Sequence, residues 1–431
     1  MRRALIEIEQ ARKLIQDQLD WNPTELVSLQ QAVGRTTARE AVSDLDSPPF
    51  DKSLVDGFAI ADYAEQLDYR ILETVTAGQV PKKSLGEPSF SPGSQAGEDK
   101  ASGQQDALLT GTAPAIRIMT GCPIPEGASG VVMVEDSRET GPDQVRLEGC
   151  RFRPGQNILP RGTVIEKGGH LLPAHHTVRA HDLGALAEFG IVDLEVYRKT
   201  RVAVLATGDE LVDPAETPGP GQIRNSNGSL LESLARNCHA EVRQLGVARD
   251  DRESLEAAIR KGLENDILVI AGGVSAGILD LIPQCLARQQ VHQVFHKVNL
   301  KPGKPLWFGK SEQGTLVFGL PGNPVSALVC FRLFVEPVIR SKNAGRCEWD
   351  SFRPGTVAER FEHRGGRRTL WPAEVTLESG QPRLRRLDWK GSADQVTFLK
   401  ANCLADLGSR PRTFAEGDEI PFLPFHAEPS F

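Results

Sequence analysis

The sequence predicts a multidomain protein, with a parallel-sheet α/β domain, a β-rich inserted domain and a small C-terminal β-barrel. Its 431 residues exceed the roughly 150 of a typical domain, so several domains are expected. Strand-like and helix-like runs alternate over 199–341, which is typical of βαβ units. Before and after that region, short apolar runs are cut by glycine and proline, which indicates small β-domains.

The N-terminal region predicts helical and linking structure. Apolar residues at helical spacing predict an amphipathic helix over 1–20: Leu5, Ile8, Ala11, Ile15 and Leu19. Asp20-Trp21-Asn22-Pro23 should end it. Residues 24–42 predict a second short helix and a strand. We expect residues 1–44 to join 151–198, which includes a helix over 177–190, in one elongated linking domain.

Residues 45–150 predict the β-rich inserted domain. Residues 44–59 hold four aspartates and two prolines without a clean period, so we expect a shaped loop there. Strands are predicted near 115–120 and 130–135. The stretch 81–115 is rich in glycine, serine and charge and predicts a flexible surface insert.

The α/β pattern follows at 199–341. The predicted strands are Arg201–Thr207, Glu241–Val247, Ile267–Ala271 and Val294–Val298. The predicted helices are Ser229–Asn237, Glu253–Leu263, Leu279–Arg288 and Pro324–Ile339. The remaining residues, 342–431, show only short apolar pieces and predict the β-barrel.

Composition narrows the function classes. Fifty Lys and Arg against 57 Asp and Glu leave a net charge of −7, which argues against a nucleic-acid binder. No apolar run reaches the ~18 residues of a membrane span, and the first residues do not resemble a signal peptide. Seven dispersed cysteines indicate reduced thiols, and therefore a cytoplasmic protein.

Candidate site residues follow the predicted strands, where ligands of open α/β sheets bind. Gly208 introduces the acidic pair Asp209 and Glu210, which could form a site or cap the next segment. The run Gly272-Gly273-Val274-Ser275 precedes a helix, so it predicts a phosphate cradle or, alternatively, a tight turn with Ser275 as N-cap. Asp280 could hold a metal or accept a hydrogen bond.

A basic turn and a stiff turn come later. Lys297, Lys301 and Lys304 lie around Pro302-Gly303, and they could bind an anion or form a solvated basic turn. Pro321-Gly322-Asn323-Pro324 should open a helix at the same sheet edge. Together with Asp250, these residues fit a phosphorylated substrate bound with Mg²⁺.

Six motifs resemble those of the molybdopterin molybdenumtransferases, which include the E domain of gephyrin. In order, they begin at Asp51 (D-x-S-x-x-D-G-F-A), Arg117 (R-I-M-T-G), Thr207 (T-G-D-E-L), Gly272 (G-G-V-S), Lys301 (K-P-G-K-P) and Gly319 (G-L-P-G-N-P-V-S-A). They cover most of the chain in the family's order. The resemblance implies a four-domain, L-shaped homodimer that inserts molybdate into adenylylated molybdopterin, with Mg²⁺ present, and releases AMP.

The resemblance also implies roles for individual residues. The residues expected to act in catalysis are Asp56, Thr120, Glu210, Asp250, Asp280, Lys297 and Lys301, with Glu210, Asp250 and Asp280 as metal ligands. Those expected to bind the pterin substrate are Gly208, Asp209, Ser226, Gly272, Gly273, Ser275, Lys304, Pro321, Gly322, Asn323 and Pro324. Asp56 and Thr120 are expected to meet the partner subunit's α/β domain. The expected protein partners are a molybdopterin adenylyltransferase and molybdoenzyme maturation factors.

Four positions depart from the family pattern. Val55 replaces a methionine, Val164 lies where the family has an acidic segment, Asn225 replaces the aspartate of D-S-N, and Ile278 replaces a frequent acid. These losses leave open a degenerate paralogue that binds the pterin nucleotide or a protein partner without metal insertion. A scaffold role and the use of tungstate instead of molybdate also stay open.

Overall fold

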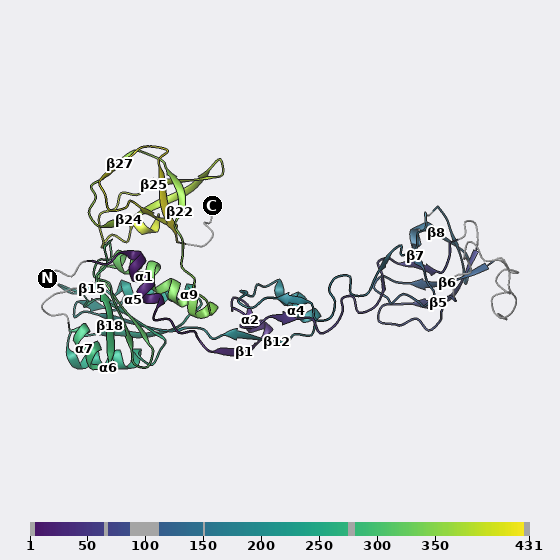
Figure 1. The fold of residues 1–431 in the computed structure, drawn as a ribbon, viewed down its shortest axis with the longest axis horizontal. Coiled ribbons are helices and arrows are strands. Elements are labelled where there is room, and N and C mark those ends of the chain that lie inside the picture. The colour runs from purple at the N-terminus through teal and green to yellow at the C-terminus, as the bar shows by residue number, and fades with distance from the viewer. Residues whose placement is uncertain (1–4, 64–67, 87–111, 150, 275–280, 426–431) are drawn as a thin grey trace. The chain divides into compact units, whose positions relative to one another are not determined.

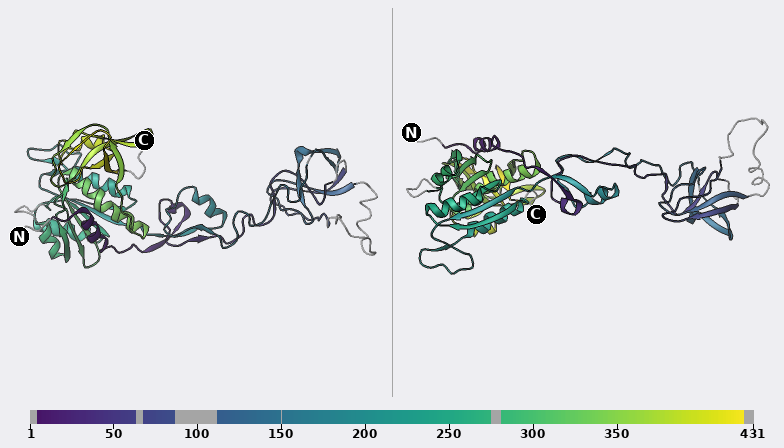
Figure 2. Two further views of the ribbon diagram at one scale, coloured as in Figure 1. Left: turned by 45° about the horizontal axis from the view of Figure 1, so that its top comes forward. Right: turned by 90° about the horizontal axis from the view of Figure 1, so that it is seen from below.

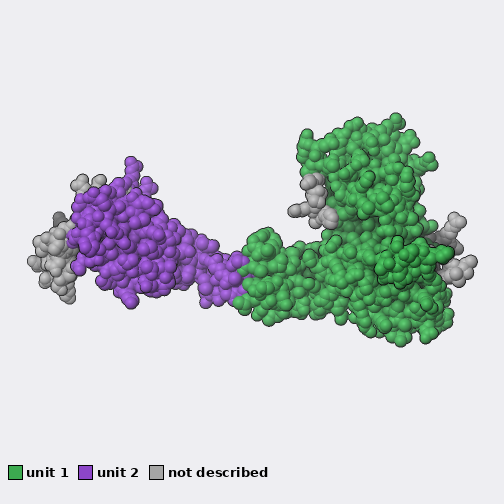
Figure 3. All heavy atoms as spheres, turned by 180° about the vertical axis from the view of Figure 1, so that it is seen from behind, with its two compact units in different colours: residues 1–39, 173–183, 192–431 green, residues 40–172, 184–191 purple. Residues whose placement is uncertain are grey.

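The computed structural model describes residues 5–63, 68–86, 112–149, 151–274 and 281–425, in two compact units (Figure 3). Unit 1 comprises residues 1–39, 173–183 and 192–431, and unit 2 comprises residues 40–172 and 184–191. None of the described helices is long and apolar enough to cross a membrane.

A mixed six-stranded sheet forms the centre of unit 1, in the order β16-β13-β17-β21-β20-β18 (Figure 1). The first four are parallel: β16 (Glu241–Ala248), β13 (Arg201–Thr207), β17 (Ile267–Ala271) and β21 (Leu316–Leu320). Strand β20 (Trp307–Ser311) is antiparallel to both of its neighbours, β21 and β18 (Val291–His296). The predicted parallel core is therefore confirmed, whereas the strand expected at 294–298 begins three residues earlier.

Helices cover both faces of this sheet because its strands bury both faces. One face packs against α1 (Ile8–Gln16), α5 (Ser226–Asn237), α8 (Pro324–Cys330) and α9 (Glu336–Ala344). The other face packs against α6 (Arg252–Gly262) and α7 (Ile282–Arg288). The helix predicted over 324–339 runs on to Ala344, with a π-helical turn at Phe331–Val335.

Several short segments, which belong partly to unit 1 and partly to unit 2, differ in detail from the prediction. Residues 24–42 begin with strand β1 (Thr24–Ser28), which pairs with β12 (Asp193–Tyr197), and only then form the short helix α2 (Leu29–Ala32). The helix expected over 177–190 is limited to α4 (Asp182–Glu188). Two short parallel strands, β14 (Leu211–Val212) and β15 (Ile223–Arg224), follow the end of β13.

The predicted C-terminal barrel is confirmed (yellow-green in Figure 1 and Figure 2). Its closed order is β24 (Arg368–Glu378), β25 (Gln381–Arg386), β22 (Arg353–Val357), β28 (Glu419–Pro424) and β26 (Cys403–Asp406), which pairs back with β24. Strand β19 (Leu300–Lys301), from the α/β domain, extends along β24. The pair β23 (Phe361–His363) and β27 (Arg412–Phe414) lies outside the ring. Strand β19 leads into the turn Lys301-Pro302-Gly303-Lys304, which we name the lysine turn. Because β19 pairs with a barrel strand, the barrel helps to position this turn.

Unit 2 is β-rich, as predicted. Its sheet has the order β7 (Gly130–Met133), β4 (Gly57–Ile60), β6 (Thr112–Ile118), β5 (Asp68–Val75), β9 (Gln144–Leu147), β8 (Ser137–Gly141). Short pairs join β3 (Lys52–Ser53) to β10 (Ile158–Leu159) and β2 (Ala41–Val42) to β11 (His170–Leu172).

Two expectations for unit 2 need correction. The loop predicted over 44–59 ends early, because Gly57–Ile60 form the buried strand β4. A Cβ at Gly57 would lie 2.0 Å from the Val132 carbonyl oxygen, so the close strand pairing requires glycine. The insert predicted over 81–115 also ends early, since 112–115 belong to β6. Its residues 87–111 lie outside the described part of the chain.

Candidate active site

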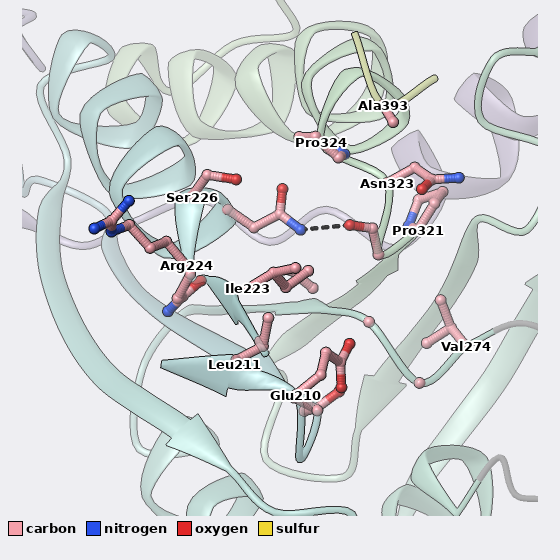
Figure 4. Close-up of a pocket in the computed structure, with 18 of the residues that line it drawn as sticks. Glu210, Leu211, Ile223, Arg224, Ser226, Val274, Pro321, Asn323, Pro324 and Ala393 are labelled. Carbon is pink, nitrogen blue, oxygen red and sulfur yellow. Dashed lines mark hydrogen bonds between the residues drawn. The ribbon is translucent and has the colours of Figure 1, made fainter. Parts of the chain in front are cut away.

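A cavity of about 610 Å³ lies at the carboxyl ends of β13, β17 and β21 (Figure 4). We name it the glycine cavity. Its lining residues are Thr207, Gly208, Glu210, Leu211, Ile223, Arg224, Asn225, Ser226, Asn227, Asp250, Ala271, Gly272, Gly273, Val274, Pro305, Pro321, Gly322, Asn323, Pro324, Ala393 and Gln395. The predicted sheet edge therefore carries the predicted glycines, carboxylates and proline turn in one wall.

Glycines shape the cavity because two strand ends approach each other closely. Gly272 and Gly273 have φ values of +102° and +60°, which glycine adopts without strain. A Cβ at Gly272 would lie 2.7 Å from the Thr207 carbonyl oxygen. The turn after β21 is tied to α5, since the Asn227 amide Nδ2 donates to the Gly322 carbonyl at 2.7 Å. These contacts make the wall stiff and bring backbone to its surface.

Two buried polar atoms of this wall lack hydrogen-bond partners in the described structure. They are Thr207 Oγ1 and Asn227 Oδ1, on residues only 5% and 9% exposed. Since the Asn227 Nδ2 already donates to a carbonyl, its Oδ1 is an acceptor in need of a donor. An unpaired buried polar atom costs about 1–3 kcal/mol, so both atoms favour a ligand in this cavity.

Carboxylates enter the glycine cavity from two neighbouring strands. The exposed side chain of Glu210, labelled in Figure 4, follows β13, and Asp250 follows β16. Asp209 is not among the lining residues, because its Oδ1 accepts the Asp250 backbone N–H at 3.2 Å and joins the two turns. The predicted residues Ser275 and Asp280 lie outside the described residues, as does Ile278.

The helix cap at Asn225 explains why the departure from the family aspartate is tolerated. Asn225 Oδ1 accepts the Gly228 backbone N–H at 2.9 Å at the start of α5. An aspartate would accept the same bond, so the asparagine keeps the cap but removes a charge from the cavity. Val164 is 69% exposed and Val55 packs on a core cluster, both in unit 2.

A second cavity of about 410 Å³ adjoins the first, and we name it the lysine cavity. Its lining residues are Lys301, Pro302, Gly303, Lys304, Pro305, Pro321, Asn323, Ser326, Arg367, Trp371, Trp389, Lys390, Gly391 and Ser392. Pro305, Pro321 and Asn323 line both cavities. Four side chains are cationic and none is a carboxylate, although Lys390 pairs with Asp388 at 2.6 Å.

The buried Cys330 thiol contacts the backbone of the lysine turn. Gly303 has φ +116°, and its carbonyl accepts from Cys330 Sγ at 3.5 Å. Opposite this turn, burial lowers the pKa of the Arg367 guanidinium, an electrostatic cost that a bound anion would relieve. The lysine cavity is thus built for negative charge.

The third predicted lysine lies elsewhere. Lys297 is half-buried and lines neither cavity, and its backbone N–H donates to the Leu306 carbonyl at 2.8 Å. Its φ of +76° marks a turn between β18 and β19. The structure therefore brings Lys301 and Lys304 together and gives Lys297 a separate place.

Asp56 and Thr120 pair within unit 2, 64 residues apart in sequence. Both the backbone N–H and the hydroxyl of Thr120 donate to Asp56 Oδ1, at 2.7 and 2.8 Å. These two bonds lower the pKa of the exposed Asp56 carboxyl. The pair therefore holds a carboxylate ionised and oriented at the surface of unit 2.

The sequence missed the residues that the barrel contributes. Gln395 donates to Ser226 Oγ at 3.0 Å, and the Asn323 amide donates to Ser392 Oγ at 3.0 Å. Arg367, Trp389 and these loop residues carry no local motif, so only the closed barrel could have placed them. Thr207 and Asn227 lie within recognised motifs, but nothing in the sequence indicates that their side-chain atoms are unpaired.

Comparisons with known proteins agree with this architecture. Residues 6–190 match the MoeA N-terminal region (domains I and II), and residues 203–341 match a probable molybdopterin binding domain. The molybdopterin molybdenumtransferase of Haemophilus influenzae is 31% identical over 98% of this chain and 99% of its own, and that of Staphylococcus aureus (strain Mu50) is 28% identical over 97% and 95%. Two crystal structures of the molybdopterin biosynthesis protein MoeA from Pyrococcus horikoshii superpose with TM-scores of 0.80 and 0.73. They are 28% and 27% identical, covering 99% and 98% of this chain and all of theirs.

Proposed function

This chain belongs to the molybdopterin molybdenumtransferase family of molybdenum cofactor biosynthesis enzymes, and on that premise we propose that its two cavities hold the two substrates of one reaction. Adenylylated molybdopterin occupies the glycine cavity, and molybdate occupies the lysine cavity. Molybdate is inserted into the dithiolene of the pterin, and AMP is released. The observation that carries this proposal is the wall of Pro305, Pro321 and Asn323 that the two cavities share.

The glycine cavity suits a nucleotide-linked pterin. Backbone at Gly272 and Gly273 can approach phosphate oxygens closely, and the unpaired Asn227 Oδ1 can accept an N–H of a heterocycle. Ser226, at the start of α5, adds a hydroxyl. These groups bind and orient the substrate before any bond changes.

The lysine cavity holds the oxyanion beside the pterin. Lys301, Lys304 and Arg367 supply positive charge, and the stiff proline turns fix where that charge lies. Because the two cavities share a wall, a bound oxyanion stays next to the substrate in the glycine cavity. The contribution of these side chains is binding and proximity.

Mg²⁺ fits the carboxylates of the glycine cavity. Among the described residues no three metal-ligating side chains cluster, but Glu210 and Asp250 both line this cavity. Mg²⁺ commonly takes one or two carboxylates and completes its shell with substrate phosphates and water. Glu210 and Asp250 would therefore hold it, and it would neutralise phosphate charge when bound.

The decisive test measures AMP release from adenylylated molybdopterin by purified protein, with and without molybdate. We expect molybdate-dependent release in the presence of Mg²⁺. Ligand binding without release would instead support the degenerate paralogue, which the lost carboxylate at Asn225 motivates. In that case Val164→Asp or Asn225→Asp should raise turnover.

The family resemblance implies a homodimer, and we propose that Asp56 and Thr120 in unit 2 of one subunit serve the other subunit's site. Mixing Asp56→Ala subunits with Glu210→Gln subunits then restores one intact site per heterodimer. Recovered AMP release in the mixture supports shared sites, and no recovery counts against them.

We also propose a cytoplasmic enzyme that receives its substrate from a molybdopterin adenylyltransferase and passes the product to maturation factors.

A further inference from the structure

Two tryptophans of the barrel line the lysine cavity, and they differ in one respect. Trp371 donates its indole N–H to the Leu387 carbonyl at 2.8 Å. Trp389 is only 8% exposed, and its Nε1 has no hydrogen-bond partner in the described structure. The rings pack edge to face, with centroids 5.1 Å apart and planes at 89°. The two rings pack well against each other, but only the Trp371 indole N–H has a hydrogen-bond acceptor.

An unpaired buried N–H is expensive, so the surroundings of Trp389 indicate what would satisfy it. An indole N–H only donates, and ammonium and guanidinium groups also only donate. Lys301, Lys304 and Arg367 line the same cavity, and no carboxylate does. The missing partner is therefore an acceptor, and an anion is the acceptor that the cationic lining of this cavity favours.

We propose that the Trp389 indole N–H donates a hydrogen bond to a tetrahedral oxyanion in the lysine cavity, and that the lack of a carboxylate among the lining residues favours a fully deprotonated one. This rests on the proposed function, which places molybdate there. A protonated oxyanion such as hydrogen phosphate would carry its O–H into a cavity with no charged acceptor for it. Molybdate, tungstate and sulfate have no proton at neutral pH and need only donors.

The position of Trp389 separates this role from packing. Its nitrogen is shielded from bulk water, so the cavity lining must open slightly for an oxyanion to reach it. Replacing Trp389 by phenylalanine removes an unpaired donor, which offsets part of the packing lost with the larger ring, so the cost in stability should be small. Replacing Trp371 removes a satisfied donor and leaves the Leu387 carbonyl unpaired, which should lower the unfolding temperature.

The experiment is calorimetric titration of the full chain with molybdate, comparing wild type, Trp389→Phe and Trp349→Phe; Trp349 also has an unpaired Nε1 in the described structure but lines neither cavity. We expect Trp389→Phe to weaken molybdate binding about tenfold, as for a lost hydrogen bond to an ion, and Trp349→Phe to change it by no more than about twofold. In wild type, sulfate and tungstate should displace molybdate more effectively than phosphate does. Equal affinity in wild type and Trp389→Phe, or equal losses in both variants, would overturn the proposal.

A second measurement observes the indole N–H groups directly in wild-type protein. In wild-type protein labelled with ¹⁵N-tryptophan, molybdate should shift one indole N–H resonance, the one absent from Trp389→Phe. If that variant does not fold, the resonance is assigned by eliminating the other four tryptophans in turn. An unshifted set of indole resonances at saturating molybdate contradicts the proposal. If wild type binds no molybdate while Lys301→Met behaves identically, the proposed function itself fails.

Discussion

The glycine cavity and the lysine cavity share one wall but are built on opposite principles. The glycine cavity combines the carboxylates Glu210 and Asp250 with unpaired atoms on Thr207 and Asn227. The lysine cavity has cations and a lone donor, with no carboxylate. The acidic and the cationic lining residues therefore lie on either side of the proline turns that the two cavities share.

The two cavities also differ in where their walls come from. The glycine cavity is made mainly by strand ends of the α/β domain, whereas about half of the lysine cavity comes from barrel residues between Arg367 and Ser392. The barrel therefore completes the lysine cavity in addition to packing on the α/β core. Variants in the two cavities should consequently affect different measurements.

Charge reversal in the lysine cavity should give the largest effect. Lys301→Glu places an anion beside the molybdate position, and we expect molybdate affinity to fall by more than about 100-fold. The affinity for AMP, measured separately, should change little. Lys400→Glu on the exposed barrel surface is the control. If AMP binding falls as far as molybdate binding, the cavities are not separate sites.

Loss of a carboxylate in the glycine cavity should give a smaller effect, and it should change AMP release instead of molybdate affinity. Glu210→Gln keeps the size of the side chain but removes a proposed Mg²⁺ ligand, so AMP release should slow by about 30-fold and require more Mg²⁺. The Kd for molybdate should stay within twofold. Glu253→Gln, in the exposed first turn of α6, serves as the matched control. A parallel loss of molybdate affinity would contradict the division of roles.

The sequence located the glycine cavity far better than the lysine cavity, for a physical reason. Glycine turns after buried strands can be predicted locally, because Gly208 and Gly272 lie where continuous apolar runs end. Lys301 and Lys304 were recognised, but the groups facing them come from a barrel whose closure depends on pairings between β24, β26 and β28. Strand Gly57–Ile60 was missed because a fully buried strand has no alternating pattern. Unpaired atoms such as Trp389 Nε1 depend on packing alone.

Substitutions of the helix-capping residue Asn225 should give a smaller effect, measured as a change in stability. Asn225→Asp keeps the bond to the Gly228 N–H and adds a negative charge at the start of α5, which should stabilise by about 0.5 kcal/mol. Thermal unfolding should therefore move up by about 1–2 °C. The same charge should lower the Mg²⁺ concentration needed for AMP release. Asn225→Ala, which loses the cap, should move unfolding down, and a rise there would contradict this assignment.

The smallest effect concerns Asp56, a proposed site residue that lines neither cavity. The Thr120 backbone N–H and hydroxyl lower the pKa of Asp56, and Thr120→Ala removes the hydroxyl, so this pKa should rise toward 3.8. Because the pKa of Asp56 is lower in the folded than in the unfolded state, this group stabilises the fold at pH values above its unfolded-state pKa. That stabilisation is lost as the pH falls through the folded-state pKa, so wild type and Thr120→Ala should differ in pH dependence only in acid. At pH 7 Asp56 stays ionised in both proteins, and any loss of AMP release there reflects orientation instead of charge. Carboxyl NMR titration from pH 2 to 6, assigned with Asp56→Asn, measures the shift. An Asp56 pKa identical in wild type and Thr120→Ala would mean that the backbone N–H alone holds this carboxylate.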